Sequence, residues 1–435
     1  MHKIKEIVLD FPENACNIYI SYIYAISEKG KTMKRALVMI LAMCLLLLCG
    51  CGANPGTTEQ ETDPVVVDYT AKEADVTTLE KLYEGRVAYH GDLHCHTDSG
   101  GNSDGQYPIG MWPSLMQEIN SDFSAIVDHQ QTLQMMLDEW DETVFISGSE
   151  CGQMVWGMDG RTKEKMHGNY LFPDLESMEN MLNEFPELFS YDPETGRFYG
   201  YGGVSDSVYL PVSRNQMAEV IESVKRNGGL FVFDHPKDEG YCPTSEDIWD
   251  YWYANETGIE VFYGQYGRAE DSQLTKLHYE LWKDLLAEGM RVWATAGSDS
   301  HQRPNTNALT TIYSTEQTGS KFVEYLRVGD FTPAPMGIRM AIGDTLMGGQ
   351  TSFEGKRLVF SVGDFHESVK QQGHKNFRVV LLDNTGEVFS EEFTAEETVY
   401  FAVDAQADKK FYRVEIYDAD RNQLIGLGNP IWNQK

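Results

Sequence analysis

The chain has 435 residues, of which 41% are hydrophobic and 12% aromatic, and it carries a formal net charge of −32. This length suggests two domains, and the composition excludes a globally disordered protein. The negative charge makes nucleic acid an unfavourable principal partner, because such complexes depend on Lys and Arg neutralising phosphates. The same charge keeps an exposed protein soluble.

The N-terminal part has the pattern of a secreted lipoprotein. A short basic start at Met33 is followed by an uncharged, mostly apolar stretch, 36–49, which is too short to span a bilayer but suits a signal peptide. The segment Leu48-Cys49-Gly50-Cys51 resembles the lipobox of bacterial lipoproteins, whose last cysteine is lipidated after cleavage. We therefore expect an extracytoplasmic protein that is anchored to the membrane through lipidated Cys51. The expected segments are a mis-assigned N-terminal extension (1–32), a signal peptide (33–50) and a tether (51–84).

The segment from Tyr89 to Gly105 holds three of the eleven histidines. Asp92, His94 and His96 alternate along an expected strand, so their side chains share one face. Two imidazoles on one face at a strand end can bind one divalent metal ion. Cys95 should point to the opposite face and behave as a small apolar residue.

From Tyr89 to about Ala296, apolar runs alternate with helical patterns. This alternation favours a mostly parallel sheet, and a β/α barrel would gather the polar residues that follow its strands at one mouth. The expected strands are 89–94, 123–128, 143–148, 169–172, 229–234, 258–262 and 291–296, and the expected helices include 112–120, 131–140, 213–227, 244–253 and 270–289.

Two further regions differ from this alternation. Residues 151–212 interrupt it with an aromatic-rich insertion, in which 191–198 is predicted to form a hairpin with its turn at Asp192-Pro193-Glu194-Thr195-Gly196. After about residue 335, short apolar runs separated by Gly, Asp and Asn indicate a small β-sandwich. The predicted domains are therefore a barrel over 85–332 and a β-sandwich over 333–435.

The remaining histidines and cysteines receive simpler interpretations. We expect His278, His366 and His374 at the surface and His90 in the core or beside the ligands. Beyond the signal peptide only Cys95, Cys151 and Cys242 remain, an odd and widely spaced set that does not indicate a disulfide framework.

Several strands end in Asp and His: Asp128-His129, Asp234-His235 and Asp299-Ser300-His301. Together with 92–97, Ser103-Asp104-Gly105 and Gly148-Ser149-Glu150, these motifs resemble the PHP (polymerase and histidinol phosphatase) family of metal-dependent phosphoesterases over about 88–305. The chain also resembles a secreted subgroup of this family through Leu281–Leu286 and Asn429-Pro430-Ile431-Trp432. That subgroup includes hydrolases of other esters.

The resemblance implies a distorted seven-stranded β/α barrel that holds up to three divalent metal ions. Carried over residue by residue, it nominates as ligands His94, His96, Asp104, His129, Glu150, His167, His235, Asp299 and His301. Imidazoles mixed with carboxylates suit Zn²⁺, Mn²⁺ or Fe²⁺. Asp92 and Arg303 are further candidates for the catalytic site: Asp92, like Asp128 and Asp234, to orient ligating histidines, and Arg303 to contact a phosphate or, alternatively, to form a surface salt bridge.

We therefore expect a metal-dependent phosphoesterase that acts on a small phosphorylated substrate. Two alternatives stay open: the same machinery acting on carboxylic or carbamate esters, and a ligand-binding lipoprotein with a structural metal centre. The sequence leaves the oligomeric state undetermined.

Overall fold

The computed structural model describes residues 69–156, 163–198, 210–237 and 256–434. The chain divides into two compact units, Met1–Val67 and Asp68–Lys435, and every described residue belongs to the second unit. The predicted signal peptide, most of the predicted tether, the expected helix at 244–253 and Cys242 lie outside the described residues. Among the described helices, none is both long and apolar enough to cross a membrane.

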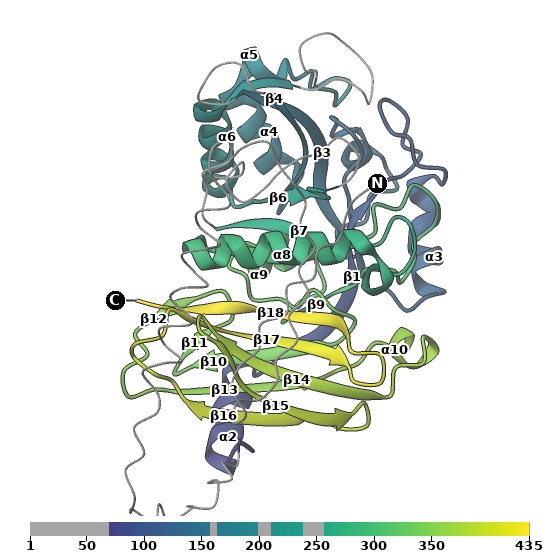
Figure 1. The fold of residues 1–435 in the computed structure, drawn as a ribbon. Coiled ribbons are helices and arrows are strands. Elements are labelled where there is room, and N and C mark those ends of the chain that lie inside the picture. The colour runs from purple at the N-terminus through teal and green to yellow at the C-terminus, as the bar shows by residue number, and fades with distance from the viewer. Residues whose placement is uncertain (1–68, 157–162, 199–209, 238–255, 435) are drawn as a thin grey trace, which may run out of the picture. The chain divides into compact units, whose positions relative to one another are not determined.

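The first sheet contains all seven strands that the sequence predicts, together with two more (Figure 1). Eight strands form one path in the order β8-β7-β6-β4-β3-β2-β1-β9, and β5 pairs with β3 beside it. Their bounds are β1 Val87–Cys95, β2 Phe123–Ile126, β3 Phe145–Trp156, β4 Lys163–Phe172, β5 Leu210–Ser213, β6 Leu230–Asp234, β7 Thr257–Tyr263, β8 Val292–Gly297 and β9 Thr310–Ser314.

This sheet curves until its two ends nearly meet. The backbone N–H of His96 donates to the carbonyl of Ser300 at 2.9 Å, which joins the end of β1 to the segment after β8. The backbone N–H of Ser298 donates to Asp92 Oδ1, also at 2.9 Å. The sheet is therefore barrel-like, and the ends of β1 and β8 lie side by side although about 200 residues separate them in the chain.

The strand directions are more mixed than the sequence predicts. The pairs β1–β2, β2–β3, β6–β7 and β7–β8 are parallel, whereas β4 runs antiparallel to both β3 and β6. The unpredicted β9 runs antiparallel to β1. The prediction of seven strands on the path was therefore wrong by one strand. An alternating pattern fixes which residues form a strand but not the direction of that strand.

Helices cover the outside of this sheet. Their bounds are α3 Trp112–Gln117, α4 Leu175–Glu184, α5 Pro186–Phe189, α6 Arg214–Arg226, α8 Gln273–Glu288 and α9 Gly319–Leu326. Helix α8 begins after Ser272, whose side chain accepts from the N–H of Leu274, and ends at Gly289, which adopts φ +92°. The serine satisfies one of the first N–H groups of the helix, and the glycine adopts the left-handed conformation that ends it.

The predicted helix at 131–140 was wrong. Only the short 3₁₀ helix η2, Leu133–Met136, forms there. The backbone N–H of Gln131 donates to Ser149 Oγ at 3.2 Å, and the N–H of Thr132 donates to the carbonyl of Gly196. These contacts attach the segment to its neighbours, and the extended backbone of Leu137 (φ −77°, ψ 146°) ends the helical turn after Met136. The second of these contacts comes from the predicted turn in the insertion, which forms as expected with Asp192 paired to Arg197.

The C-terminal part forms two further sheets. One has the order β11-β10-β13-β16 and the other β12-β18-β17-β14-β15. The strands are β10 Gly337–Ile342, β11 Thr345–Leu346, β12 Gln350–Thr351, β13 Arg357–Gly363, β14 Asn376–Asp383, β15 Gly386–Thr394, β16 Val399–Asp404, β17 Phe411–Asp418 and β18 Gln423–Asn433, with the short helix α10 at Glu367–Gln371. Both sheets contribute to one hydrophobic cluster, with Met340 and Phe360 from the first and Val379 and Val414 from the second.

A helix also forms within the predicted tether. Helix α2, Glu73–Leu82, buries Leu79 in a cluster with Val359 and Ala402. Asp75 on this helix pairs with Arg357 at 2.9 Å. Residues 73–82 therefore pack against the C-terminal sheets through an apolar contact and an ion pair.

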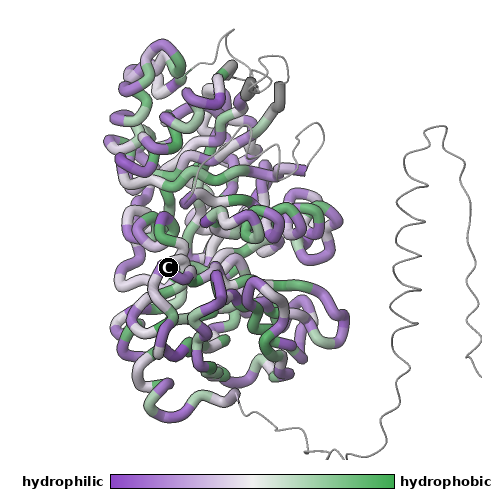
Figure 2. The backbone as a smooth tube through the Cα atoms, turned by 60° about the vertical axis from the view of Figure 1, so that its left-hand side comes forward, coloured by the Kyte–Doolittle hydropathy of each residue, from purple (hydrophilic) through white to green (hydrophobic). Residues whose placement is uncertain are grey.

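Hydrophobic and hydrophilic residues alternate along the described backbone, as expected for strands and helices that bury one face (Figure 2). The interior nevertheless holds three histidines that the sequence analysis placed at the surface: His278, His366 and His374 are each at most 4% exposed. Those three predictions were wrong. His374 shows the physical reason, since its Nδ1 lies 2.6 Å from Asp418 Oδ2 and a partner distant in sequence offsets the cost of burial.

Candidate metal centre

The nine predicted ligand residues come together at one mouth of the barrel-like sheet. They are carried by β1, β3, β4 and the segments that directly follow β1, β2, β6 and β8. They form three linked groups, within each of which one ligand atom per residue lies within 4.8 Å of the others: His94-His96-Glu150-Asp299, His96-Asp104-His129-His301 and Glu150-His167-His235. All nine predicted ligands are therefore neighbours in space, and we call this set the nine-residue cluster.

The first group occupies the centre of the cluster. Asp299 Oδ1 lies 3.1 Å from His96 Nε2 and 3.4 Å from His94 Nε2. Glu150 Oε2 lies 3.2 Å and 3.4 Å from the same two nitrogens. Two imidazoles and two carboxylates thus converge from β1, β3 and the segment after β8.

Glu150 and His96 connect this group to the other two. Glu150 Oε1 lies 2.5 Å from His167 Nδ1 and 3.3 Å from His235 Nε2, so one carboxylate faces two groups with its two oxygens. His96 Nδ1 lies 3.9 Å from Asp104 Oδ1. Residues shared in this way can hold neighbouring ions close together.

Two further contacts join the members of the group that contains Asp104. Asp104 Oδ2 lies 3.2 Å from His301 Nε2 and 3.5 Å from His129 Nε2. Asp104 is 38% exposed at its side chain, whereas Glu150 is 1% exposed. The cluster therefore runs from a buried floor at Glu150 to an accessible rim at Asp104 and His301.

Mutual attraction of opposite charges shifts the titration of these groups. Burial lowers the pKa of His96, but the neighbouring carboxylates Asp299 and Glu150 raise it to about 10. Burial likewise opposes the charged form of His235, and Glu150 raises its pKa to about 9. Burial raises the pKa of Glu150, but His167, His129 and His94 hold it well below its usual range. The site therefore stabilises carboxylates in their charged, ligating form.

Buried polar atoms within the cluster indicate that its residues fit metal ions. Among the described residues, His94 Nε2, both ring nitrogens of His96 and Asp299 Oδ1 have no hydrogen-bond partner although they are shielded from solvent. A buried polar atom without a partner costs about 1–3 kcal/mol. Bound cations would use these atoms, and the mixture of imidazole and carboxylate suits Zn²⁺, Mn²⁺ or Fe²⁺.

Two of the aspartates that precede histidines accept hydrogen bonds from backbone N–H groups rather than from imidazole rings. Asp92 Oδ1 accepts from the N–H groups of His94 at 3.0 Å and Ser298 at 2.9 Å, so it fixes two strand ends rather than orienting a histidine ring. Asp128 accepts from the N–H and the hydroxyl of Thr97, both at 2.7 Å. The expectation that these two residues hydrogen-bond to ligating imidazoles was wrong.

Glu260 is the main site residue that the sequence analysis missed. Its Oε1 lies 3.1 Å from His94 Nδ1, and its Oε2 accepts from the backbone N–H of His235 at 3.0 Å. It lies in the middle of β7 and is 1% exposed. The signal available in the sequence was a single glutamate within the apolar run 259–262, because a glutamate is almost never fully buried unless it is paired.

Asp234 lies beside this contact. His94, Asp234 and Glu260 form a fourth group of neighbouring ligand-type atoms. Neither oxygen of Asp234 has a hydrogen-bond partner among the described residues. Burial, in the first place, raises the pKa of Asp234 well above its usual range, and nearby Glu260 adds to the shift.

Two ligand-bearing turns have an unusual backbone. His235 adopts φ +25° and Asp299 φ +48°, values that residues other than glycine rarely take. Such conformations persist where the surrounding structure holds them, and they concentrate at functional sites. Both turns direct their side chains toward Glu150 and His94.

Cys95 and His90 occupy the places that the sequence predicts. Cys95 is fully buried in a cluster with Ile126 and Phe145, away from the ligands. His90 Nδ1 lies 2.8 Å from Thr311 Oγ1 in the adjoining strand, and burial lowers its pKa to about 3.

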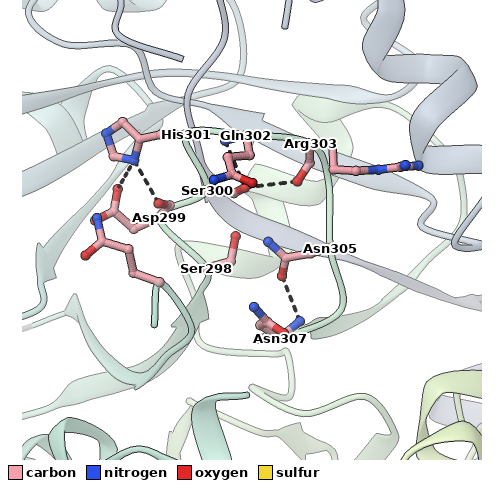
Figure 3. A pocket seen from close by; sticks show the side chains of 9 residues that line it. Ser298, Asp299, Ser300, His301, Gln302, Arg303, Asn305 and Asn307 are labelled. Carbon is pink, nitrogen blue, oxygen red and sulfur yellow. Dashed lines mark hydrogen bonds and ion pairs between the residues drawn. The ribbon is translucent and has the colours of Figure 1, made fainter. Parts of the chain in front are cut away.

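Arg303 forms a salt bridge with Glu118 and points away from His301 (Figure 3). The salt-bridge alternative therefore describes its position in this structure. A contact with phosphate stays a prediction.

Comparisons with known proteins give partial likenesses. No family model matches the chain, and no curated protein sequence matches it significantly. A solved structure of a proposed metal-dependent phosphoesterase from Bifidobacterium adolescentis is 16% identical, with a TM-score of 0.30, and the match covers 50% of this chain and 89% of that one. An amidohydrolase from Chromobacterium violaceum is 17% identical, with a TM-score of 0.32 and coverage of 50% and 88%.

The lesion-specific endonuclease Q from Pyrococcus furiosus is 15% identical, with a TM-score of 0.37. The match covers 56% of this chain and 57% of that one, so it spans little more than half of the endonuclease. The endonuclease acts on DNA lesions, whereas the expectation that this chain does not bind nucleic acid rests on its charge and stays a prediction. The function is therefore inferred from the site itself.

Proposed function

We propose that this chain is a metal-dependent phosphoesterase of the PHP family that hydrolyses small phosphate esters. One observation carries the proposal: nine His, Asp and Glu residues from distant parts of the sequence converge in three groups that share His96 and Glu150. A structural metal site is usually closed by four ligands. Nine candidates arranged in linked groups favour neighbouring ions with positions left for water and substrate.

Bound divalent ions would activate a water molecule near neutral pH and neutralise the charge that develops on the phosphoryl group. The residues of the chain would hold these ions and orient one another's ligand atoms. Glu150 presents one oxygen to His94 and His96 and the other to His167 and His235. Glu260 holds His94 through Nδ1, which keeps Nε2 directed at Glu150 and Asp299.

The positive charge of bound ions also makes the pocket attractive to an anionic substrate in spite of the acidic chain. Ions are often the largest local charges in a site and dominate the field there. Asp104 and His301 lie at the accessible rim, 38% and 28% exposed at their side chains, and they are the ligands that an entering phosphate meets first. An ester that fits the mouth can thus reach the cluster.

The experiment is metal analysis combined with hydrolysis assays. The purified protein should contain more than one transition metal ion per chain and should cleave a generic phosphate ester. Replacing His94 and His96 with alanine should abolish cleavage and lower the metal content while leaving the protein folded. His374→Gln, a histidine outside the nine-residue cluster, is the matched control and should keep its metal content.

The outcomes separate this proposal from its rivals. A protein without affinity for Zn²⁺ or Mn²⁺ would contradict every metallohydrolase interpretation. Hydrolysis of carboxylic or carbamate esters without cleavage of any phosphate ester would favour the first alternative. Metal binding without hydrolysis would favour a ligand-binding lipoprotein.

The proposed location is the outer face of a bacterial membrane, through lipidated Cys51. The support is the sequence pattern of 33–51. Cys51→Ala should move the protein from the membrane fraction to the soluble fraction. Unchanged fractionation of the variant would contradict the lipid anchor.

A further inference from the structure

A pocket of about 470 Å³ opens beside the nine-residue cluster, and the proposed reaction does not use most of its lining (Figure 3). Asp299 and His301 form the side of the pocket that faces the cluster. The volume lies in the range of small-molecule sites. A group attached to a phosphoryl at the cluster would enter this space.

The lining of the pocket is rich in carboxamides. Gln265, Gln302, Asn305 and Asn307 all line it. Each carboxamide offers two N–H donors and a carbonyl acceptor, so this wall presents both kinds of hydrogen-bonding group without net charge. Hydroxyl groups also donate and accept, and they are the ligand groups that match such a wall.

Hydrogen bonds to neighbouring backbone groups hold two of these side chains in place. Asn305 Oδ1 accepts from the N–H of Asn307 at 2.8 Å, and Asn307 Nδ2 donates to the carbonyl of Gly264 at 3.1 Å. The amide nitrogen of Asn305 and the amide oxygen of Asn307 have no partner among the described residues, so a donor and an acceptor are held in place for a ligand. Groups that are already oriented lose less entropy when they bind.

Tyr263 joins this wall to the nine-residue cluster. Its hydroxyl lies 2.9 Å from Asp299 Oδ2 and 2.8 Å from the side-chain amide of Gln265. The Gln265 atom is the amide oxygen Oε1, an acceptor like Asp299 Oδ2, so the single hydroxyl proton can be donated to only one of the two at a time. The pocket is therefore continuous with the cluster through hydrogen bonds.

The lining also argues against other classes of ligand. Among the described lining residues the only Lys or Arg side chain is Arg303, which pairs with Glu118, and Asp299 adds a negative charge. A second phosphate or a carboxylate would thus meet no unpaired cation among the described lining residues. These residues also include no aliphatic side chain and no Phe, Tyr or Trp, so an aryl group or a nucleobase would find no aromatic ring among them to stack on.

We infer that this pocket binds the leaving group of the substrate and that this group is a neutral polyol, so the substrate is the phosphate monoester of a sugar or sugar alcohol. The inference rests on the proposed phosphoesterase function. In the reaction, water forms a new bond to phosphorus, the ester P–O bond breaks, and a proton from the water passes to the departing sugar oxygen. The products are inorganic phosphate and the free sugar.

The test uses the full chain loaded with Mn²⁺ or Zn²⁺ and compares three kinds of substrate. These are a panel of hexose, pentose and polyol monophosphates, phenyl phosphate, and adenosine monophosphate. Gln302→Met and Asn305→Leu remove carboxamides at nearly constant volume, and Gln302 is exposed, so its loss does not threaten folding. Gln371→Met, on helix α10, is the matched control. One neutral hydrogen bond contributes about 0.5–1.5 kcal/mol, which corresponds to about two- to tenfold in kcat/KM.

The expected result is a two- to tenfold loss of kcat/KM for the best sugar phosphate in each pocket variant, about unchanged phenyl phosphate hydrolysis, and no effect of the control. Equal losses on all substrates, or a preference for adenosine monophosphate that the pocket variants remove, would overturn the inference. Cleavage of phenyl phosphate but of no sugar phosphate would overturn it while leaving the proposed function intact.

Failure to cleave any phosphate ester would instead refute the proposed function. Saturation-transfer NMR with neutral sugars would then test whether the pocket binds a polyol, independently of any reaction. Transfer to a sugar that Asn305→Leu weakens would support the polyol site, and the absence of transfer in the wild-type protein would overturn it.

Discussion

Replacement of Glu260 by glutamine should weaken metal binding although Glu260 is not among the nine ligands. Glu260 uses both oxygens as acceptors, at 3.1 Å from His94 Nδ1 and at 3.0 Å from the backbone N–H of His235. Glutamine has nearly the same shape but only one acceptor oxygen. One of the two contacts must therefore face an amide N–H.

Either orientation of the glutamine harms the site. If its N–H₂ faces His94, Nδ1 must accept, and the ring proton moves to Nε2, the atom that faces Glu150 and Asp299. If it faces His235, two donors oppose each other in a buried place, which costs about 1–3 kcal/mol. Loss of such a carboxylate partner typically lowers metal affinity about 10–100-fold, or about 1.4–2.7 kcal/mol.

The assay is a chelator competition that measures the dissociation constants of Zn²⁺ and Mn²⁺, with thermal unfolding of the metal-free protein as a check on folding. Asp418→Asn is the matched control, because Asp418 forms a carboxylate–histidine contact with His374 at 2.6 Å outside the nine-residue cluster. Its metal affinity should equal that of the wild type. Unchanged metal affinity in Glu260→Gln, or equal losses in both variants, would refute the reasoning.

Three further predictions concern single substitutions. Gly297→Ala should lower metal affinity and the melting temperature, because a Cβ there would overlap Glu260 Oε1 and His94 Cβ. Such overpacking costs about 1–3 kcal/mol. A fully stable, metal-replete variant would contradict this prediction. Burial lowers the pKa of His374, but Glu270 and Asp418 raise it above its ordinary value of 6.5. Its stabilisation is therefore complete below pH 6.5 and lost as pH rises through the raised pKa, so urea unfolding of His374→Gln should show a deficit of about 1.5–3 kcal/mol at acidic pH that shrinks at alkaline pH. Arg303→Ala should change kcat/KM for phenyl phosphate less than about fivefold, as expected for an exposed ion pair; a loss of a hundredfold or more would instead support a direct contact with phosphate.

Much of the site could be predicted from the sequence because its information is local. Six of the nine predicted ligands lie at or just after strand ends, whereas Glu150 and His167 lie within β3 and β4 and Asp104 lies in the loop after β1. Alternation along β1 places His94 and His96 on one face and Cys95 on the other. The expected strands formed for the same reason, since apolar runs bounded by polar turns require no distant partner to be recognised.

The remainder depended on partners that are distant in sequence. Ser149 and Gly196, which are distant in sequence, hold Gln131 and Thr132, and only a short 3₁₀ helix forms within 131–140. The direction of strands was equally inaccessible from the sequence: β4 was predicted as a strand, but nothing in its pattern indicated that it runs antiparallel to β3 and β6, and β9 was not predicted.

By itself the sequence determined which residues can ligate metals and which segments form strands, because both follow from side-chain chemistry and from a period of two residues. Only the tertiary structure decided that Glu260 supports His94 and that Asn305 and Asn307 face the pocket beside Asp299. The physical reason is the curvature of the sheet. It brings β1 next to the end of β8, and hydrogen bonds across that junction join residues that no local pattern connects.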